Sequence, residues 1–389
     1  MISGRRKTVL VLHLAGQIPL AGIAWQALHY VLGLRRLGYD VWYVEDSGAN
    51  PYDPRQQSIV EDCSYNVGFV RAMMERFDLG DRWAYWDAAS DVVHGISRER
   101  LQALYGEADA LVNLCGATRL REEHLRIPVR IFIDTDPVFE QAKVAARNPE
   151  SLHYLGAHTH HFTYGENLGN PDCPVPLELF RWQKTRPPVL VDLWDAGCVA
   201  AGPYLTTIAT WENKGKDIEV GGQTYHWSKH VNFLKFLDLP RQLLSPFRLA
   251  MTPPDRDVEA QVKAGGWDIV DPVPISADMQ AYRDFIVTSR GEFTVAKDIY
   301  VRPNSGWFSD RSVCYLAAGR PVITQETGFS KFVETGRGLF PFSTLDEIRE
   351  AVARINADYA KQSIGAIEVA YEFFDADSVL RELVRQSDI

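Results

Sequence analysis

Two carboxylates stand directly after an apolar run near the middle of the chain. Asp134 and Asp136 follow residues 131–133, which have the composition of a buried strand. Open α/β sheets bind ligands at the carboxyl ends of their strands, so we expect Asp134 or Asp136 to contact a substrate hydroxyl or act as a base. Two alternatives stay open, a divalent-metal site and a phosphohydrolase with Asp134 as nucleophile. A helix cap ahead of Pro137 accounts for Asp136 alone.

A second group of residues that could bind a ligand lies between positions 297 and 311. Arg302 and Arg311 flank a Gly-Trp turn, and Ser309 is placed to cap the helix that follows. Two guanidiniums at a helix N-terminus are suited to holding a diphosphate. Lys297 adds a cation, with a solvated surface position as the alternative. Gly22 opens the first predicted helix, where a phosphate can approach backbone N–H groups, although a flexible turn also accounts for it.

The histidines gather in one place, at His158, His160 and His161. Strand alternation puts His158 and His160 on one face. Two imidazoles on one face can bind zinc, but no third ligand is evident, so we predict no metal site. Packing and a role of His160 in a substrate cleft are the two interpretations left.

The composition excludes several classes of protein. A formal charge of −10 disfavours nucleic acid and anionic membrane surfaces as partners. The five cysteines are scattered without a CxxC pair, which argues against a zinc ribbon or a disulfide framework. Residues 5–14 imitate a signal peptide, but Gln17 and Pro19 interrupt the apolar run. We therefore expect a first buried strand and a cytoplasmic protein without membrane insertion, with secretion as the alternative.

The elements that position these residues alternate between strand and helix. A continuous apolar run at 8–14, a helical pattern at 23–37 and a second strand at 39–44 form a strand–helix–strand unit. Further strands are predicted at 110–114, 129–134 and 161–164. The stretch from 50 to 87 lacks a clean period and is interpreted as an insertion.

The second half repeats the alternation after a proline-rich break. Strands are predicted at 205–211, 247–251, 267–270 and 321–325, with helices at 255–264, 277–289, 310–318 and 345–355, the last opened by a capping box of Thr344 and Glu347. Gly221-Gly222 signals a hairpin. The predicted domains are 1–175 and 189–370, joined by a linker at 176–188, with a helix in 371–389 returning to the first domain.

Two segments resemble the family 4 glycosyltransferases of the GT-B fold. One is Pro19-Leu20-Ala21-Gly22, followed after fifteen residues by Gly38-Tyr39-Asp40-Val41. The other runs from Ser305-Gly306-Trp307 through Ala317-Ala318-Gly319-Arg320-Pro321-Val322-Ile323 to Gly328-Phe329 and Gly336-Arg337-Gly338-Leu339. The resemblance implies two Rossmann-like domains facing a central cleft and transfer of a sugar from a nucleotide-sugar donor, with no other cofactor, to a small-molecule or glycan acceptor.

One departure from that family bears on the donor site. Its usual glutamate pair falls on Gly306 and Cys314 here, so Asp310, Arg311 or Glu326 must substitute. The predicted donor residues are Gly22, Lys297, Arg302, Gly306, Ser309, Asp310, Arg311 and Glu326, and the predicted catalytic residues are Asp134, Asp136 and His160. A GT-B nucleotide-sugar epimerase, a haloacid-dehalogenase-like phosphohydrolase using Asp134 and a non-catalytic sugar-binding protein stay open as alternatives. An NAD site is disfavoured because Glu45 and Asp46 end the second strand without a GxGxxG loop.

Overall fold

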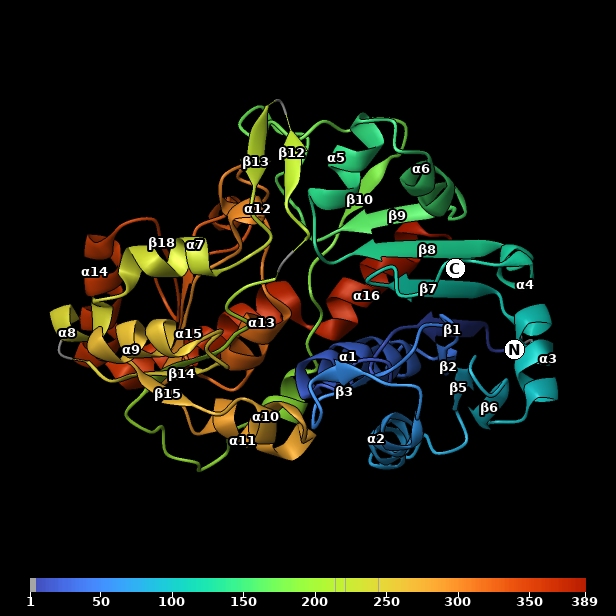
Figure 1. Cartoon of the computed structure of the whole chain (residues 1–389), viewed down its shortest axis with the longest axis horizontal. Coiled ribbons are helices and arrows are strands. Elements are labelled where there is room, and N and C mark those ends of the chain that lie inside the picture. The colour runs from blue at the N-terminus through green and yellow to red at the C-terminus, as the bar shows by residue number, and fades with distance from the viewer. Residues whose placement is uncertain (1–4, 214, 221, 244) are drawn as a thin grey trace.

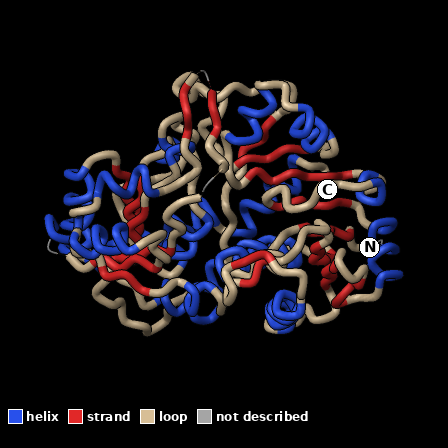
Figure 2. The backbone as a smooth tube through the Cα atoms, viewed as in Figure 1, coloured by secondary structure: helices blue, strands red, loops and turns tan. Residues whose placement is uncertain are grey.

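The computed structural model describes residues 5–389 except 214, 221 and 244, and it consists of two α/β domains (Figure 1). Each domain is built around its own sheet, with helices beside the strands (Figure 2). The predicted strand–helix alternation is therefore confirmed in both halves.

The N-terminal sheet has eight strands in the order β10-β9-β8-β7-β1-β2-β5-β6, and only the β5–β6 pair is antiparallel. Its central strands are apolar and buried on both faces, as parallel strands between helical layers must be. The strands are β1 (Thr8–Leu12), β2 (Asp40–Glu45), β5 (Trp83–Asp87), β6 (Val92–Gly95), β7 (Ala110–Leu114), β8 (Val129–Asp134), β9 (His160–Thr163) and β10 (Trp182–Lys184). The helices are α1 (Ala21–Arg36), α2 (Ser64–Glu75), α3 (Arg98–Glu107), α4 (Glu122–Leu125), α5 (Phe139–Ala145) and α6 (Pro149–Gly156), and β3 (Tyr52–Asp53) pairs with β4 (Ser58–Ile59).

The C-terminal sheet has six parallel strands in the order β15-β14-β11-β16-β17-β18. They are β11 (Leu205–Ile208), β14 (Phe247–Ala250), β15 (Asp268–Val270), β16 (Gly291–Thr294), β17 (Val322–Gln325) and β18 (Leu339–Phe342). The helices are α7 (His230–Phe233), α8 (Leu239–Leu243), α9 (Arg256–Ala264), α10 (Val273–Ser276), α11 (Met279–Val287), α12 (Asp298–Val301), α13 (Asp310–Ala317), α14 (Leu345–Ala357) and α15 (Tyr359–Val369). A hairpin of β12 (Ile218–Val220) and β13 (Gln223–Tyr225) forms where the glycine pair predicts it; Gly221 itself lies outside the described residues.

The chain crosses between the domains twice, and the two crossings lie side by side. The N–H of Val189 donates to the carbonyl of Phe374 at 2.8 Å, and the N–H of Ala376 donates to the carbonyl of Val189 at 2.9 Å. After the second crossing, α16 (Ala376–Gln386) packs on α1, where Leu380 lies against Gly33. The predicted return of the last helix to the first domain is thus confirmed.

Some elements differ from the sequence prediction. The stretch 50–87 is no insertion over the sheet, because it supplies α2 and the sheet strand β5. Strands β16 and β18 were not predicted. In the part of the chain that the structure describes, no helix has the length and apolar character that a membrane crossing requires.

Candidate functional site

A pocket of about 580 Å³ lies between the two domains, where the carboxyl ends of β1 and β11 face each other. The N-terminal domain contributes the start of α1 and the β3–β4 hairpin with its turn, and the C-terminal domain contributes the loop after β11 and the start of α13. This is the place where open parallel sheets bind ligands. Five of the predicted donor residues line it, namely Gly22, Lys297, Ser309, Asp310 and Arg311.

Three cations of the C-terminal domain converge on the pocket: Lys229, Lys297 and Arg311. Lys229 follows the β12–β13 hairpin, Lys297 precedes α12 and Arg311 stands in the first turn of α13. These side chains place three basic groups along one wall of the pocket, two of which, Lys297 and Arg311, are ion-paired within the protein. A wall of this kind is suited to a diphosphate.

Arg311 is held firmly by the C-terminal sheet. Its Nε donates to Glu292 at 2.6 Å, its Nη1 to the carbonyl of Ile208 at 2.8 Å and its Nη2 to Oγ1 of Thr294 at 2.9 Å. The Glu292 side chain is fully buried. Three of the five guanidinium N–H groups are thereby used, so Arg311 presents a fixed cation to the pocket rather than a mobile one.

Lys229 is the functional candidate that sequence reasoning missed. Its Nζ makes a single polar contact, 3.4 Å from Oγ1 of Thr294, and forms no ion pair with any described residue. Burial and the nearby Arg311 lower the pKa of Lys229 well below its ordinary value. A partly buried lysine without a counter-ion among the described residues favours an anionic ligand at this place, because the anion would stabilise its charged form.

Lys297 connects the pocket to the N-terminal domain. Its Nζ lies 2.8 Å from Oδ1 of Asp136 and 3.9 Å from the ring centroid of Trp227. The Tyr300 hydroxyl donates to the same Asp136 oxygen. Asp136 is therefore placed beside the pocket, bonded to a residue that lines it.

The start of α13 carries a carboxylate into the pocket. Ser309 caps the helix, its Oγ accepting the N–H of Arg311 at 3.3 Å, as predicted. Burial raises the pKa of Asp310 to about 6, and the charge of Asp136 adds to the effect. Within the described residues, Oδ1 of Asp310 has no hydrogen-bond partner. Asp310 lines the pocket, but this unpaired oxygen is itself buried, so a ligand hydroxyl could reach it only after the side chain turns.

Gly22 brings the two domains close together. A Cβ atom on this residue would lie 3.2 Å from the Tyr282 hydroxyl of α11. The first turn of α1 therefore meets the C-terminal domain at the edge of the pocket, and a larger side chain would narrow it.

Asp134 and His160 do not lie in this pocket. Asp134 is buried, and its Oδ2 accepts hydrogen bonds from Gln141 at 2.7 Å and from Thr163 at 2.9 Å. Burial raises its pKa to about 7. His160 lies at a separate depression beside Arg181 and Arg385. The expectation that both face a substrate needs correction, because one is enclosed by its own sheet and the other stands away from the cleft.

Three predicted donor residues are also placed elsewhere. Arg302 is exposed and contacts the β12–β13 hairpin, where it donates a hydrogen bond to the carbonyl of Thr224 at 2.5 Å. Gly306 is buried at the interdomain contact with Asn167. The carboxylate of Glu326 accepts the N–H of Thr327 at 2.9 Å and caps its own turn.

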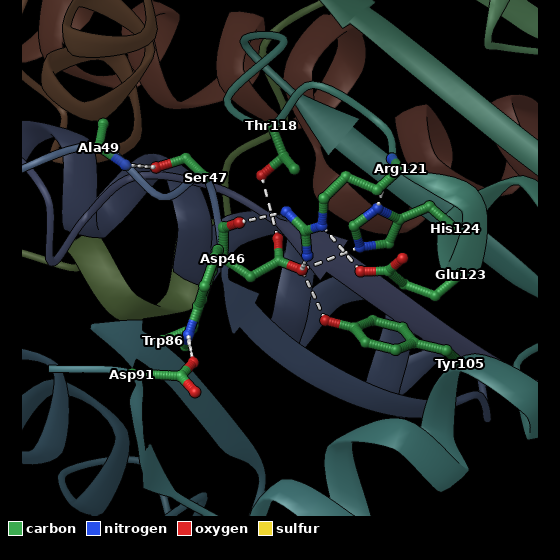
Figure 3. Close-up of polar contacts among 10 residues, drawn as sticks. All are labelled: Asp46, Ser47, Ala49, Trp86, Asp91, Tyr105, Thr118, Arg121, Glu123 and His124. Carbon is green, nitrogen blue, oxygen red and sulfur yellow. Dashed lines mark hydrogen bonds and ion pairs between the residues drawn. The ribbon is translucent and has the colours of Figure 1, made fainter. Parts of the chain in front are cut away.

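Asp46, the residue that follows β2, takes part in a network of hydrogen bonds and ion pairs (Figure 3). Oδ2 of Asp46 accepts hydrogen bonds from Tyr105 at 2.6 Å and Arg121 at 2.7 Å, and lies 2.9 Å from Nε2 of His124. Because Nδ1 of His124 accepts the N–H of Arg121, its proton is on Nε2 and points at Asp46. These partners hold the pKa of Asp46 well below its ordinary value even though burial opposes them. Asp46 is buried, and this network engages its side chain.

Comparison with solved structures identifies the architecture. Sucrose-phosphate synthase from Thermosynechococcus elongatus is similar over 98% of this chain and 99% of its own, with 15% identity and a TM-score of 0.56. HepE from Anabaena in complex with UDP and glucose is similar over 98% of this chain and 99% of its own, with 11% identity and a TM-score of 0.54. A glycosyltransferase from Rickettsia africae matches 99% of this chain and 98% of its own, with 10% identity and a TM-score of 0.55.

The chain has the GT-B fold. The predicted fold, two Rossmann-like domains facing a cleft, is confirmed. No model of a protein family matches the sequence, and neither does any curated protein. Identities of this size establish the fold alone, so the activity is argued from the pocket.

Proposed function

We propose that the protein is a glycosyltransferase that moves a hexosyl group from a nucleoside-diphosphate sugar to a small-molecule or glycan acceptor. The observation that carries this proposal is the cationic wall of the interdomain pocket, and above all the unpaired Lys229. Sugar transfer leaves a diphosphate that gains charge as the glycosidic bond breaks. Fixed cations at that position stabilise the transition state more than the ground state.

Each side chain has a distinct part in this proposal. Arg311 is the fixed cation, Lys229 supplies the ammonium that lacks a counter-ion, and Lys297 is shared between the diphosphate and Asp136. Asp310 lines the pocket and, after a turn of its side chain, accepts a hydrogen bond from a hydroxyl of the sugar or the acceptor with the oxygen that has no partner among the described residues. The acceptor enters from the side of α1 and the β3–β4 hairpin.

A binding experiment with matched lysine variants tests the donor site. The wild-type protein is titrated by calorimetry with UDP-, GDP- and dTDP-glucose, and the best ligand is repeated with Lys229→Met and Lys235→Met. Lys235 is an exposed lysine bonded to Asn232 and serves as the control. We expect Lys229→Met to weaken binding about tenfold or more and Lys235→Met to leave it unchanged, since a charge-assisted hydrogen bond contributes roughly 1.5–3 kcal/mol. Equal affinities in all three proteins would remove Lys229 from the donor site.

Turnover separates the remaining alternatives. Transfer to a supplied acceptor mixture supports the proposal, conversion of the donor to its epimer without an acceptor indicates an epimerase, and binding without turnover indicates a sugar-binding protein. The phosphohydrolase alternative needs a nucleophilic Asp134 open to substrate. The buried, doubly hydrogen-bonded Asp134 gives it no support.

A further inference from the structure

Three metal-ligating side chains meet at the edge of the N-terminal domain, away from the interdomain pocket. Cys63 is the residue before α2, Asp87 ends β5 and His94 lies in β6. Tyr85 is paired with His94 in the antiparallel register, so Asp87, two residues further on, shares a face with His94. The start of α2 lies over that face and brings Cys63 to the other two.

The ligand atoms are spaced as one metal ion requires. One atom from each of the three side chains lies within 4.8 Å of the others, and Sγ of Cys63 is 3.9 Å from Nε2 of His94. A tetrahedral zinc ion with Zn–S of about 2.3 Å and Zn–N of about 2.0 Å separates the two ligand atoms by about 3.6 Å. A shift of a few tenths of an ångström would bring these two atoms to that separation, and the Asp87 oxygen lies within 4.8 Å of both.

The surroundings leave each ligand available. Oδ1 of Asp87 accepts the N–H of Ala89 at 3.0 Å and Oδ2 accepts the hydroxyl of Ser90, which leaves a further lone pair on each oxygen. Cys63 is a buried free cysteine, and burial together with the charge of Asp87 raises the pKa of its thiol to about 11. Asp87 and His94 are only partly buried, which provides a path for entry.

We propose that Cys63, Asp87 and His94 bind one zinc ion, with water in the fourth position. A thiolate, an imidazole and a carboxylate together select zinc over magnesium or calcium. This site departs from the expectation of no metal, which weighed the aspartates at 134 and 136, the histidines near position 160 and the scattered cysteines, but not a set drawn from Cys63, Asp87 and His94.

The position of the site gives the ion a structural task. It would tie α2 to the β5–β6 hairpin. The segment that leads into Cys63 carries Tyr52, Pro54 and Gln57, which line the interdomain pocket. The metal would therefore hold in place the chain that forms one rim of that pocket.

Cobalt titration of the chelator-treated full-length protein tests the proposal. We expect one equivalent of Co²⁺ to produce a thiolate-to-cobalt charge-transfer band and visible bands of a tetrahedral ion, both removed by Zn²⁺. Cys63→Ser and His94→Gln should abolish the charge-transfer band or weaken binding beyond detection. Asp87→Asn should weaken binding by at least about tenfold, since even indirect partners of metal ligands contribute that much. Cys198→Ser removes an exposed cysteine and is the matched control that keeps the band.

A second measurement keeps the proposal testable if Cys63→Ser fails to fold. X-ray absorption of the zinc-loaded wild type should show one sulfur at about 2.3 Å with nitrogen or oxygen neighbours near 2.0 Å. A shell without sulfur, a wild type that gives no charge-transfer band, or a band that survives in Cys63→Ser would each overturn the assignment. None of these results depends on the proposed sugar transfer.

Discussion

Asp136 and Lys297 form an ion pair across the interdomain cleft. Oδ1 of Asp136, just beyond β8, lies 2.8 Å from Nζ of Lys297, just before α12. Lys297 is mostly buried, and the Asp136 side chain is 44% exposed. The same ammonium lines the pocket, so it faces a carboxylate on one side and the proposed diphosphate on the other.

This shared position predicts opposite effects of two substitutions. Lys297→Met should weaken UDP-glucose binding about tenfold, because a charge-assisted contact is lost. Asp136→Asn should leave binding unchanged or strengthen it, since a competing anion is neutralised. Calorimetry on the two variants measures both affinities. Equal losses would mean that the pair acts only by holding the domains together.

Lys229 predicts proton uptake on donor binding. Its pKa is lowered by burial and by Arg311 in the free protein, and a bound diphosphate would raise it. Between the two pKa values the complex holds more protons than the free protein, so affinity falls as pH rises, by up to about tenfold per pH unit. Calorimetry with UDP-glucose in two buffers of different ionisation enthalpy measures the uptake. Lys229→Met should remove it, and an uptake unchanged in that variant would contradict the assignment.

The buried Asp134 predicts a stability difference that depends on pH. Burial raises its pKa from 3.8 to about 7, so the folded state keeps the carboxyl neutral where the unfolded chain has ionised it. The neutral carboxyl makes its full contribution to the free energy of unfolding below about pH 4. That contribution is lost as the pH rises toward 7, and the loss is roughly 4 kcal/mol at most. Urea unfolding of wild type and Asp134→Asn at pH 4.5 and 7.5 measures the difference. The wild type should lose stability relative to the variant as pH rises, and parallel curves would show that Asp134 ionises normally.

The backbone conformation of Gly306 predicts that an alanine at this position lowers the stability of the protein, and Gly68 provides a matched control. Its φ is 80°, and a Cβ atom would lie 2.4 Å from the backbone nitrogen of Asn167 in the other domain. Gly306→Ala should destabilise the protein by about 2 kcal/mol or more. Gly68→Ala, in the exposed part of α2 with open space around it, should stabilise by up to about 1 kcal/mol. Thermal unfolding of both variants checks the pair; a tolerated Gly306→Ala would show that the contact can yield.

The sequence predicted the fold better than it predicted the site. Strand β1 is almost entirely apolar, and a strand of that composition is expected to be buried on both faces, as all five of its residues are. The pattern does not predict strand β16 because Glu292 interrupts its apolar residues. The buried charge of Glu292 is accommodated by its ion pair with Arg311, which lies nineteen residues later. Strand β18 contains Pro341, which is accommodated because β18 is an edge strand.

The proposed donor site depends on the directions in which side chains point, and the spacing of residues in the sequence does not encode these directions. Arg302 and Arg311 flank one turn in the sequence, yet α12 directs Arg302 toward the hairpin while α13 directs Arg311 toward the sheet. Lys229 has no glycine loop or long helix beside it that would have marked it. Its place in the pocket follows from the packing of the hairpin segment against β16, where Thr294 is its contact.

The paired crossings at Val189 and Ala376 define how the domains can move. Both connections run through one narrow strip of backbone, joined by hydrogen bonds of 2.8 and 2.9 Å. A rotation of one domain relative to the other must twist both together, so the strip acts as a single pivot rather than two independent tethers. The pivot lies against the start of α13, because the rings of Phe374 and Phe308 stack with their centroids 4.9 Å apart. Displacement grows with distance from a pivot, so Ser309 and Asp310 would move less than the outer parts of either domain when the cleft opens or closes.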